Sequence, residues 1–574
     1  MHVWYPTHFS DLEGASLPIV LGSVNFDTCL AQVRNGDFGL TGGTDNQGRP
    51  VSNISLATAI TYDLCVVACG SGSEPFVWNI FSQQFSAWLL PYLALVSQLP
   101  FGANNRLDNL LSMLLTVGSP TLAAYSLALT VLNEQWIAQR FSALSYPNVR
   151  NAVKVLTGLQ QSPLHVNADD SLLASLVVLH ANDNYWETLE DLLNYVQTWS
   201  IAAVASILWV IIAYVFTVID SFLGVVTYST LNSNGQAVGS IFLWLLPIVV
   251  GWLQISPKCD HERVHQAVER ANKIAYVASP FLPNARSTSA KAPATVHRDE
   301  HCTAPIYNYA RFLPWSLSVE NVYYAFREAS ERSQSYEPVD SGLEWEKGVK
   351  GDRNMRVHPR NRTGSLSQVS DYVKIKAAEF ELNLKPRSRW GPGVVSRFLL
   401  AALLALSLTW GTTGAAVLVA FFTPTKGIAC RSGSYLIYGV NSTLVWMLLV
   451  ASSLLAHYST FTVSFKGRYM HTKATRLAAV LSIILRRLGK TLAALNSIWV
   501  ILVCLFQFGS VFDRCWCNSS VPYWGKHAYN VIDVTSSDVE ALNAPWIGGV
   551  ALASGCAILF IGFVNVLINP ALPD

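Results

Sequence analysis

The sequence predicts an all-α fold, that of a polytopic membrane protein with about seven or eight transmembrane helices and a large cytoplasmic insertion. Of its 574 residues, 51% are hydrophobic and only 13% are charged, a balance too apolar for an ordinary soluble enzyme. The apolar residues gather in runs of about 18 or more without an interior charge, and a helix of that length crosses a hydrocarbon core of about 30 Å. We therefore expect the chain to lie in a lipid bilayer.

Residues 1–79 are predicted to form an extracytoplasmic segment that contains cysteines. Their start lacks the basic n-region and long apolar h-region of a cleaved signal peptide, so an internal helix is expected to target the chain. Residues 80–133 hold a first membrane helix and a second apolar run, from about 110 to 132. Pro120 lies at the centre of that run, where proline kinks or splits a helix. The second run is therefore expected to be re-entrant or kinked.

The rest of the chain divides into four regions by composition. Residues 134–198 carry basic residues near their start and are predicted to be a cytoplasmic helical segment. Residues 199–256 predict a transmembrane hairpin. Residues 257–392 are mixed in charge and contain stretches rich in proline and serine, which predicts a cytoplasmic, partly disordered domain that would bind any cytoplasmic protein partner. Residues 393–574 predict a four-helix transmembrane block with cysteines in its outer loops.

The orientation follows from lysine and arginine, which are enriched in cytoplasmic loops. The 464–490 link carries seven of them and no acidic residue, so it is predicted to be cytoplasmic. The 257–392 region and the C-terminus then share its side, while 424–435 and 513–545 face outward. If the Pro120 run is re-entrant, seven helices cross and the N-terminus is outside. If that run crosses, there are eight crossings and the N-terminus is inside.

The composition also limits the partners and the compartment. A formal net charge of +2 gives no basic face for a nucleic acid, so the lipid bilayer is the expected partner. The chain is predicted to be multi-pass in the plasma membrane or an endomembrane. No cofactor motif is present, and no ligand is identified by the sequence.

The placement of the ten cysteines predicts disulfides on the outer side. Cys430 lies in one predicted outer loop, and Cys515 and Cys517 lie in the other. An oxidising exterior permits a bridge from Cys430 to either of them, although buried free cysteines are also common. Three further cysteines join this group if the N-terminus is outside: Cys29, Cys65 and Cys69.

Glycosylation sequons give a test of the topology. Asn53 and Asn518 begin Asn-x-Ser sequences on the predicted outer side and are the candidate acceptors. Asn361 begins another sequon, but it is predicted to be cytoplasmic and therefore unmodified.

One enzyme motif occurs, because His261-Glu262-Arg263-Val264-His265 matches H-E-x-x-H. On a helix, His261 and His265 share a face and can bind zinc while Glu262 acts as the general base. The motif begins shortly after a predicted membrane helix in a polar stretch, a context typical of a solvated amphipathic helix. A zinc site also needs a third ligand, for which the candidates are Glu269, Glu320 and Glu328.

Asp220 is the candidate polar residue within the membrane. It follows the long apolar run of the third predicted helix, and an ionisable group inside a bilayer is costly unless it is paired or hydrated. There it would bind a cation or relay protons. The alternative is that Asp220 marks the outer end of that helix.

Four stretches together resemble a group of uncharacterised multi-pass membrane proteins from filamentous and mushroom-forming fungi. They are Tyr62–Gly70, Cys302–Arg311, Cys430–Gly439 and Arg514–Asn518. The resemblance spans nearly the whole chain and implies a fungal integral membrane protein with a cysteine-bearing amino-terminal region. That group has no assigned activity, and its members need not carry the H-E-x-x-H motif.

Two classes of function remain from the sequence. The first is a non-enzymatic membrane protein that acts in transport, sensing or scaffolding. The alternative is a membrane-associated zinc metalloprotease with Glu262 as its catalytic base and His261 and His265 as metal ligands.

Overall fold

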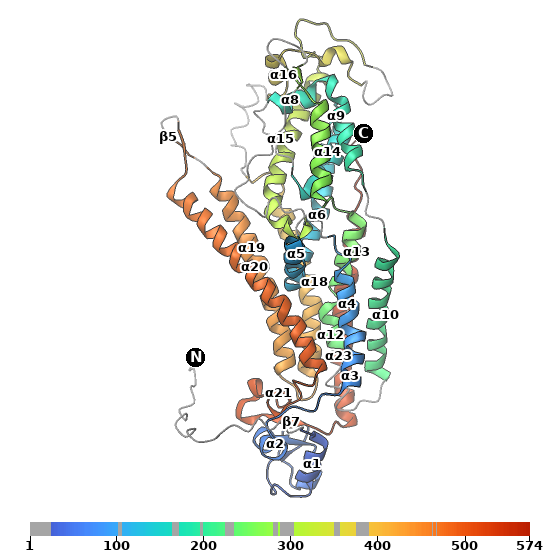
Figure 1. Ribbon diagram of the computed structural model, residues 1–574, viewed down its shortest axis with the longest axis vertical. Helices are drawn as coiled ribbons and strands as arrows, with labels where there is room; N and C mark the ends of the chain where they lie inside the picture. The colour runs from blue at the N-terminus through green and yellow to red at the C-terminus, as the bar shows by residue number, and fades with distance from the viewer. Residues whose placement is uncertain are drawn as a thin grey trace.

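The computed structural model is elongated and mostly helical, which confirms the predicted helical class (Figure 1). It describes residues 24–100, 106–163, 171–195, 199–223, 235–278, 285–286, 304–348, 356–374, 390–461, 463–465 and 468–573. Three levels follow one another along the long axis: a disulfide-linked unit at one end, a central helical bundle, and a helical domain at the other end. We call these the disulfide end, the bundle and the upper domain.

The disulfide end joins two segments that are distant in the sequence. A small antiparallel sheet has the strand order β1-β2-β7, and Ala59 of β2 pairs with Val531 of β7. The N-terminal segment and the 513–545 loop therefore lie at the same end of the molecule. The elements of this unit are α1 (Phe26–Arg34), β1 (Gly43–Thr44), η1 (Ile54–Leu56), β2 (Ala59–Thr61), α2 (Tyr62–Cys69), α21 (Cys515–Asn518), α22 (Val521–Trp524), η8 (Gly525–His527) and β7 (Tyr529–Val531).

Six of the described helical segments are long and apolar enough to cross a membrane. They are α10 (Ile201–Leu223), the consecutive helices α12 (Gly235–Phe242) and α13 (Leu245–Ile255), α18 (Val394–Phe422), α19 (Cys430–Ser459), α20 (Lys473–Phe508) and α23 (Ser536–Leu567). The predicted first membrane helix is instead three short consecutive pieces, α3 (Trp78–Gln84), the π-helical η2 (Phe85–Leu89) and α4 (Leu90–Val96), and it is not among the six.

The second apolar run is broken at its proline. Helix α5 (Arg106–Gly118) and helix α6 (Pro120–Phe141) meet at an angle of 101°, and they raise the number of candidate spans to seven if they count as one. Figure 1 shows α5 at mid-height and α6 rising from it towards the upper domain. The pair therefore does not run from one end of the bundle to the other.

Side chains from two other helices satisfy the broken backbone. Ser119 Oγ donates to the Ser442 carbonyl of α19 at 2.8 Å, and the Ser442 hydroxyl accepts from the Thr121 N–H at 3.2 Å. On the other side of the break, Asn496 of α20 donates to the Gly118 carbonyl at 2.8 Å. Unpaired backbone groups are costly away from water, so these contacts allow a helix break inside the bundle.

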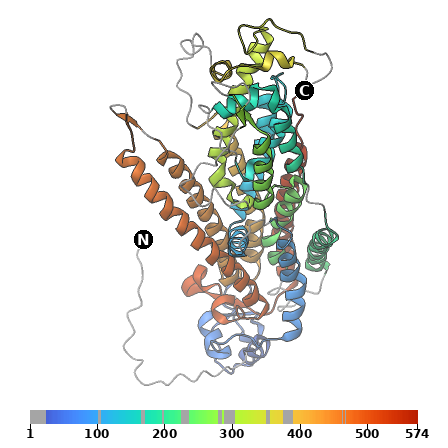
Figure 2. The same cartoon turned by 45° about the horizontal axis from the view of Figure 1, so that its top comes forward.

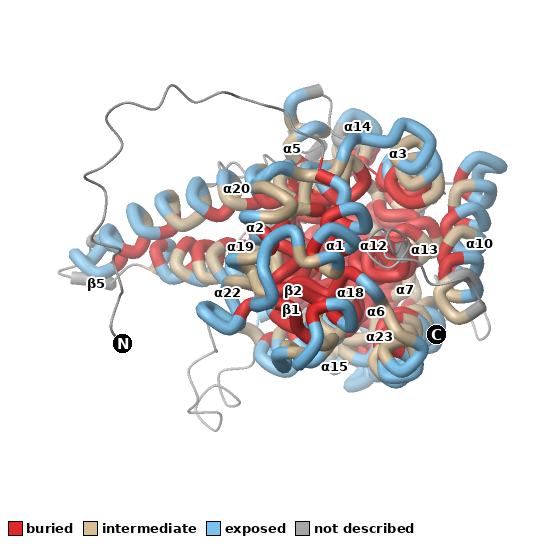
Figure 3. The backbone as a smooth tube through the Cα atoms, turned by 90° about the horizontal axis from the view of Figure 1, so that it is seen from below, coloured by how far each residue is buried: buried red, intermediate tan, exposed pale blue. Residues whose placement is uncertain are grey.

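The bundle is one unit and not two halves. Helix α18 packs against α19 and α23, as a carboxyl-terminal block requires, but also against α6 and α12 from the amino-terminal half. Helix α10 lies at the edge of the bundle in both side views and in the view along the axis (Figures 1, 2 and 3). Its large apolar side chains point outward, and Phe216 is 65% exposed. Such a face is typical of contact with lipid.

The upper domain unites the two predicted cytoplasmic regions, 134–198 and 257–392. One hydrophobic core contains buried residues from both, including Trp186, Val264 and Phe326. Its elements are α7 (Val149–Gly158), η3 (Leu159–Gln161), α8 (Ser171–Val178), η4 (His180–Asn182), α9 (Asp183–Leu193), α14 (His261–Ile274), β3 (Tyr276–Val277), β4 (Ala285–Arg286), α15 (Asn308–Gln334), η7 (Pro359–Arg362) and α16 (Leu366–Tyr372). The short η6 (Pro305–Tyr307) before α15 packs in the core of the bundle. Sequence analysis separates these two regions, because the contacts between them join residues that are far apart along the chain.

Helix α15 connects the upper domain to the bundle. Its first turns, with Phe312 and Leu313, belong to the core of the bundle, whereas Trp315 and Phe326 belong to the core of the upper domain. One continuous helix therefore holds the two levels in a fixed relation.

Candidate functional site

Three disulfides form at the disulfide end, and all six of their cysteines are the ones singled out in the sequence. Cys430 bonds to Cys517, which selects one of the two alternatives for its partner. Cys65 bonds to Cys515 across 450 residues of sequence, and Cys29 bonds to Cys69. The sulfur atoms of Cys65, Cys69 and Cys515 lie within 4.8 Å of one another, but each is already used in a disulfide.

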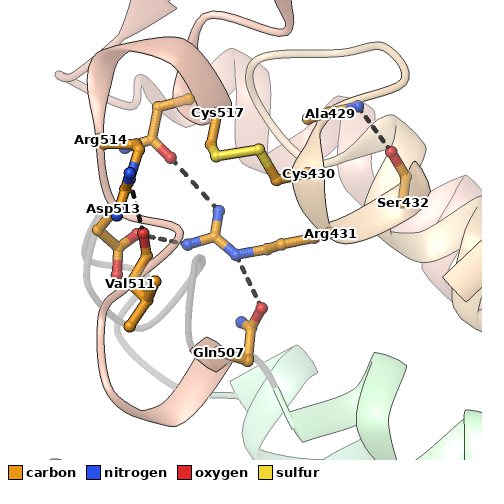
Figure 4. Close-up of a disulfide and its surroundings, with 10 residues drawn as sticks. Ala429, Cys430, Arg431, Ser432, Gln507, Val511, Asp513, Arg514 and Cys517 are labelled. Carbon is orange, nitrogen blue, oxygen red and sulfur yellow. Dashed lines mark hydrogen bonds and ion pairs between the residues drawn. A yellow bond between two sulfur atoms is a disulfide. The ribbon is translucent and has the colours of Figure 1, made fainter. Parts of the chain in front are cut away.

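Arg431, next to the Cys430–Cys517 bridge, organises the polar groups around it (Figure 4). Its guanidinium pairs with Asp513 and donates through Nε to Gln507 at 2.9 Å. Asn518 is buried in the same surroundings, and its amide nitrogen is inaccessible to solvent. The Asn518 side chain is therefore less accessible to a glycan than that of Asn53, which is exposed, and glycosylation of either residue stays a prediction.

Glu74 is the titrating group of the disulfide end. Its backbone N–H donates to the Asp513 carbonyl at 2.9 Å, which holds the residue beside a second acid. Burial first, and then the charge of Asp513, raise the pKa of Glu74 to about 7.

We expect the disulfide end to lose stability as the pH rises from about 4.5 to about 7. In the folded protein Glu74 binds its proton more tightly than at its ordinary pKa of 4.5, so stability falls between that pH and about 7. The loss should be on the order of 1 to 2 kcal/mol, because water screens part of the effect at this half-buried carboxyl. This loss of stability is measured by hydrogen exchange of the α1 and α2 amides between about pH 5 and pH 8, with the exchange rates corrected for the intrinsic effect of pH. Glu74→Gln should remove the pH dependence, and an unchanged dependence would contradict the assignment.

The H-E-x-x-H motif forms the first turns of α14. Asp260 caps this helix by accepting from the Arg263 N–H at 3.1 Å, and the helix packs on the upper domain through Val264 and its neighbours one and two turns on. Glu262 is exposed, and His265 is 60% exposed and pairs with Glu269 at 3.7 Å. The side chain of His261 lies outside what the structure describes. This placement is typical of a solvated helix face.

Of the three proposed third zinc ligands, only Glu269 lies beside the motif, where it is exposed and pairs with His265. Glu320 makes a bidentate ion pair with Arg140, and Glu328 is buried in α15. Among the described residues, histidine, cysteine and acidic ligand atoms converge within metal-binding distance only at the three disulfide cysteines. Asp220 lies in the last turns of α10, and its side chain is outside the described residues.

A polar cavity lies where the bundle meets the upper domain. It has a volume of about 410 Å³, within the size range of small-molecule sites. Its walls come from α6, α7, η3, α9, the end of α13 and the C-terminal tail, which brings together segments from the whole length of the chain. The polar residues that line it include Thr130, Glu134, Lys154, Gln160, Gln161, Glu190, Asn194, Lys258 and Asn569.

A buried hydrogen-bond network holds one wall of this cavity. Asn133 of α6 donates to the Gln160 side chain at 3.0 Å, and Gln160 donates to the Thr130 carbonyl at 3.3 Å. Arg397, near the start of α18, donates to Asn133 and lies 3.9 Å from the centre of the Trp136 ring. The network therefore fixes Gln160 against α6 and places a buried cation behind it.

A second buried cation lies behind Gln161. Arg311 of α15 donates to both the backbone carbonyl and the side-chain oxygen of Gln161, the latter at 2.8 Å. These bonds orient the amide of Gln161, which is only 2% exposed. Its Nε2 atom has no hydrogen-bond partner within the described part of the chain. A buried donor without a partner is costly, which indicates a place for a ligand or water acceptor.

The charged groups on the cavity wall have both signs. Lys154 pairs with Glu190 at 2.6 Å. Lys258 lies 4.8 Å from the centre of the Tyr195 ring, and burial lowers its pKa. Glu134 makes no ion pair or hydrogen bond with any described residue. The cavity thus presents an ammonium group, the carboxyl group of Glu134 and an amide group to an occupant.

No protein-family model, curated protein or solved structure matches the chain. Its own geometry is therefore the basis for assigning a function. Sequence reasoning missed the cavity, because its walls come from five helices and the tail. The available signal was the row of polar residues on α6, at Ser126, Thr130 and Asn133, which share one helical face in an otherwise apolar run.

Proposed function

We propose that the chain is a non-enzymatic, multi-pass membrane protein that binds a small polar solute in the junction cavity, in transport or sensing. The observation that carries this proposal is the cavity itself, with the buried amide donor of Gln161 and the carboxyl group of Glu134 on its walls. A scaffold has no need of a fixed polar cavity. Binding sites commonly lie between helices and carry a few oriented polar groups.

The membrane topology that fits this proposal has seven crossings. These are the six candidate spans and, as a seventh, the consecutive pieces α3, η2 and α4, with α5 and α6 as a re-entrant pair. The disulfide end then faces an oxidising exterior or lumen, where its three disulfides persist. The upper domain, the basic 464–490 link and the C-terminus face the cytoplasm, in accord with the distribution of lysine and arginine.

The zinc protease alternative has less support from the structure. Glu262 and His265 lie on an exposed helix face, whereas a catalytic zinc site needs a shaped cavity and three protein ligands. Membership of the resembling fungal group stays a prediction.

The chemistry of the wall indicates the class of solute. The buried Glu134 carboxyl group can donate or accept a hydrogen bond, and a cationic group of the solute beside it would favour its ionised form. The Gln161 amide and Lys258 favour an acceptor or anionic group. A small zwitterion, such as an amino acid, satisfies both. Neutral polyols are the competing class.

A thermal-shift screen of the purified protein tests this assignment. The panel contains the proteinogenic amino acids, small dicarboxylates and monosaccharides. A ligand at about 100 times its Kd should add about 2.7 kcal/mol to the free energy of unfolding. Glu134→Gln and Gln161→Leu should abolish the shift, while the control Gln254→Leu, at a position that bonds Asn565 outside the cavity, should keep it. A panel without any stabilising solute, or a shift that survives both cavity variants, would contradict the proposal.

A further inference from the structure

The hairpin of α19 and α20 extends beyond the bundle. Both side views show it leaving the long axis obliquely, with β5 (Val463–Phe465) and β6 (Arg468–Met470) at its tip (Figures 1 and 2). We call its outer part, α19 from Val450 and α20 up to Lys490, the arm. Helix α20 has 36 residues, so at about 1.5 Å per residue it is about 54 Å long, well above the about 30 Å of a hydrocarbon core.

The two helices of the arm meet through small polar residues. Ser452 donates through its hydroxyl to the Ser482 carbonyl at 2.7 Å, and Ser482 donates to the Ser452 carbonyl at 2.8 Å. Gly489 lies against Leu449, where a Cβ atom would come within 2.9 Å of the leucine side chain. The inner face is therefore closely packed by small residues, and the large apolar residues are left on the outside.

An apolar stripe runs along the outer face of α20 in the arm. Leu477 is 68% exposed, and the stripe continues at three- and four-residue spacing, which is one face of a helix. It does not stop at the arm, because Leu495 and Ile498 extend it into the candidate membrane span. The members within the arm are Leu477, Val480, Leu481, Ile484 and Leu488.

Basic residues accompany the stripe. Helix α20 contains no acidic residue, and all of its cations lie in the arm: Lys473, Arg476, Arg486, Arg487 and Lys490. An exposed apolar stripe next to cations is the pattern of a helix that lies in the headgroup region of a bilayer with anionic lipids. A water-soluble face would not carry this row of exposed leucine, isoleucine and valine.

We propose that the arm is a binding surface for anionic phospholipids in the leaflet next to the upper domain. The exposed cations Lys473, Arg476 and Arg487 bind the lipid phosphates, and the stripe inserts between the acyl chains. Charge complementarity and the continuity of the stripe with the membrane span carry this inference. It rests on the proposed membrane location of the bundle.

Lipid selectivity tests the charges. The full chain is reconstituted in phosphatidylcholine with spin-labelled phosphatidylserine or phosphatidylcholine, and the preference for the anionic lipid is measured. The triple variant Lys473→Gln/Arg476→Gln/Arg487→Gln should lower the preference for the anionic lipid by up to about fivefold per cation. The matched control Arg270→Gln/Lys273→Gln/Lys374→Gln removes three exposed cations from the upper domain. This control should keep the full preference for the anionic lipid. No preference in the unmodified protein, or an equal loss in the control, would overturn the proposal.

Fluorescence quenching tests the stripe and separates the two proposals. A bimane label is placed on Leu481→Cys in the arm or on Leu559→Cys, which is 74% exposed on α23. Brominated lipid should quench both labels, and aqueous iodide should quench neither strongly. If only the Leu559→Cys label is quenched by the lipid, the arm proposal fails and the membrane proposal stands. If neither is quenched by the lipid, the membrane location fails as well. Shielding of Leu481→Cys from both quenchers would show a protein contact and also overturn the arm proposal.

Discussion

Replacing Asp183 with alanine should destabilise the upper domain by about 3 to 5 kcal/mol, because it leaves a buried guanidinium without its partner. Arg362 has no exposed side-chain surface, and it donates to both carboxylate oxygens of Asp183, at 2.9 and 2.6 Å. The pair joins η7 to the start of α9 across 179 residues of sequence. Its loss should free the 356–374 segment from the domain core.

Hydrogen exchange of the α9 and α16 amides measures this effect. We expect protection in Asp183→Ala to fall by about a hundredfold or more, while the bundle helices keep theirs. Asp191→Ala, an exposed acid on the same helix α9, is the matched control and should leave exchange unchanged. Equal behaviour of the two variants would show that the ion pair does not stabilise the domain.

Cleavage of the chain between residues 287 and 303 should leave its two fragments covalently joined. This segment lies outside the described residues, and a protease site inserted there separates Cys29, Cys65 and Cys69 from Cys430, Cys515 and Cys517. Cys29–Cys69 and Cys430–Cys517 each lie within one fragment, so Cys65–Cys515 is the only described disulfide between the fragments. On a non-reducing gel the cut protein should therefore run as one band, and a reductant should give two.

Two double variants identify the bridge. Cys65→Ser/Cys515→Ser should give two bands without reductant. Cys430→Ser/Cys517→Ser removes an equal number of cysteines and should still give one. Two bands from the unmodified cut protein would contradict the pairing of the N-terminal segment with the 513–545 loop.

Much of the bundle can be predicted from local sequence, because a long uncharged apolar run has few alternatives to a membrane helix. Pro120 likewise marks the helix break, since proline cannot complete the helix backbone. The outer cysteines were identified from their loops, although their pairing depends on the fold. Local sequence cannot show that β2 meets β7, because that contact joins segments about 470 residues apart.

The cavity and the single upper domain were beyond sequence reasoning for a related reason. Arg311 and Arg397 each look like ordinary cations in the sequence, but both are buried behind the cavity wall by packing of α6, α15 and α18. Nearly all of helix α6 is buried, so the polar face formed by Ser126, Thr130 and Asn133 does not by itself show which segments pack against it. Such positions depend on tertiary contacts.

The central claim is that the disulfide end and the upper domain lie on opposite sides of a membrane. Ser52 is exposed at the disulfide end and Ser335 is exposed in the upper domain, so cysteine at either position reports its side. In sealed microsomes, whose outer surface is cytoplasmic, and in a Cys302→Ala/Cys556→Ala background, a membrane-impermeant maleimide should label Ser335→Cys at once. It should label Ser52→Cys only after detergent opens the vesicles. Labelling of both positions in sealed vesicles, or the reverse order, would contradict the claim.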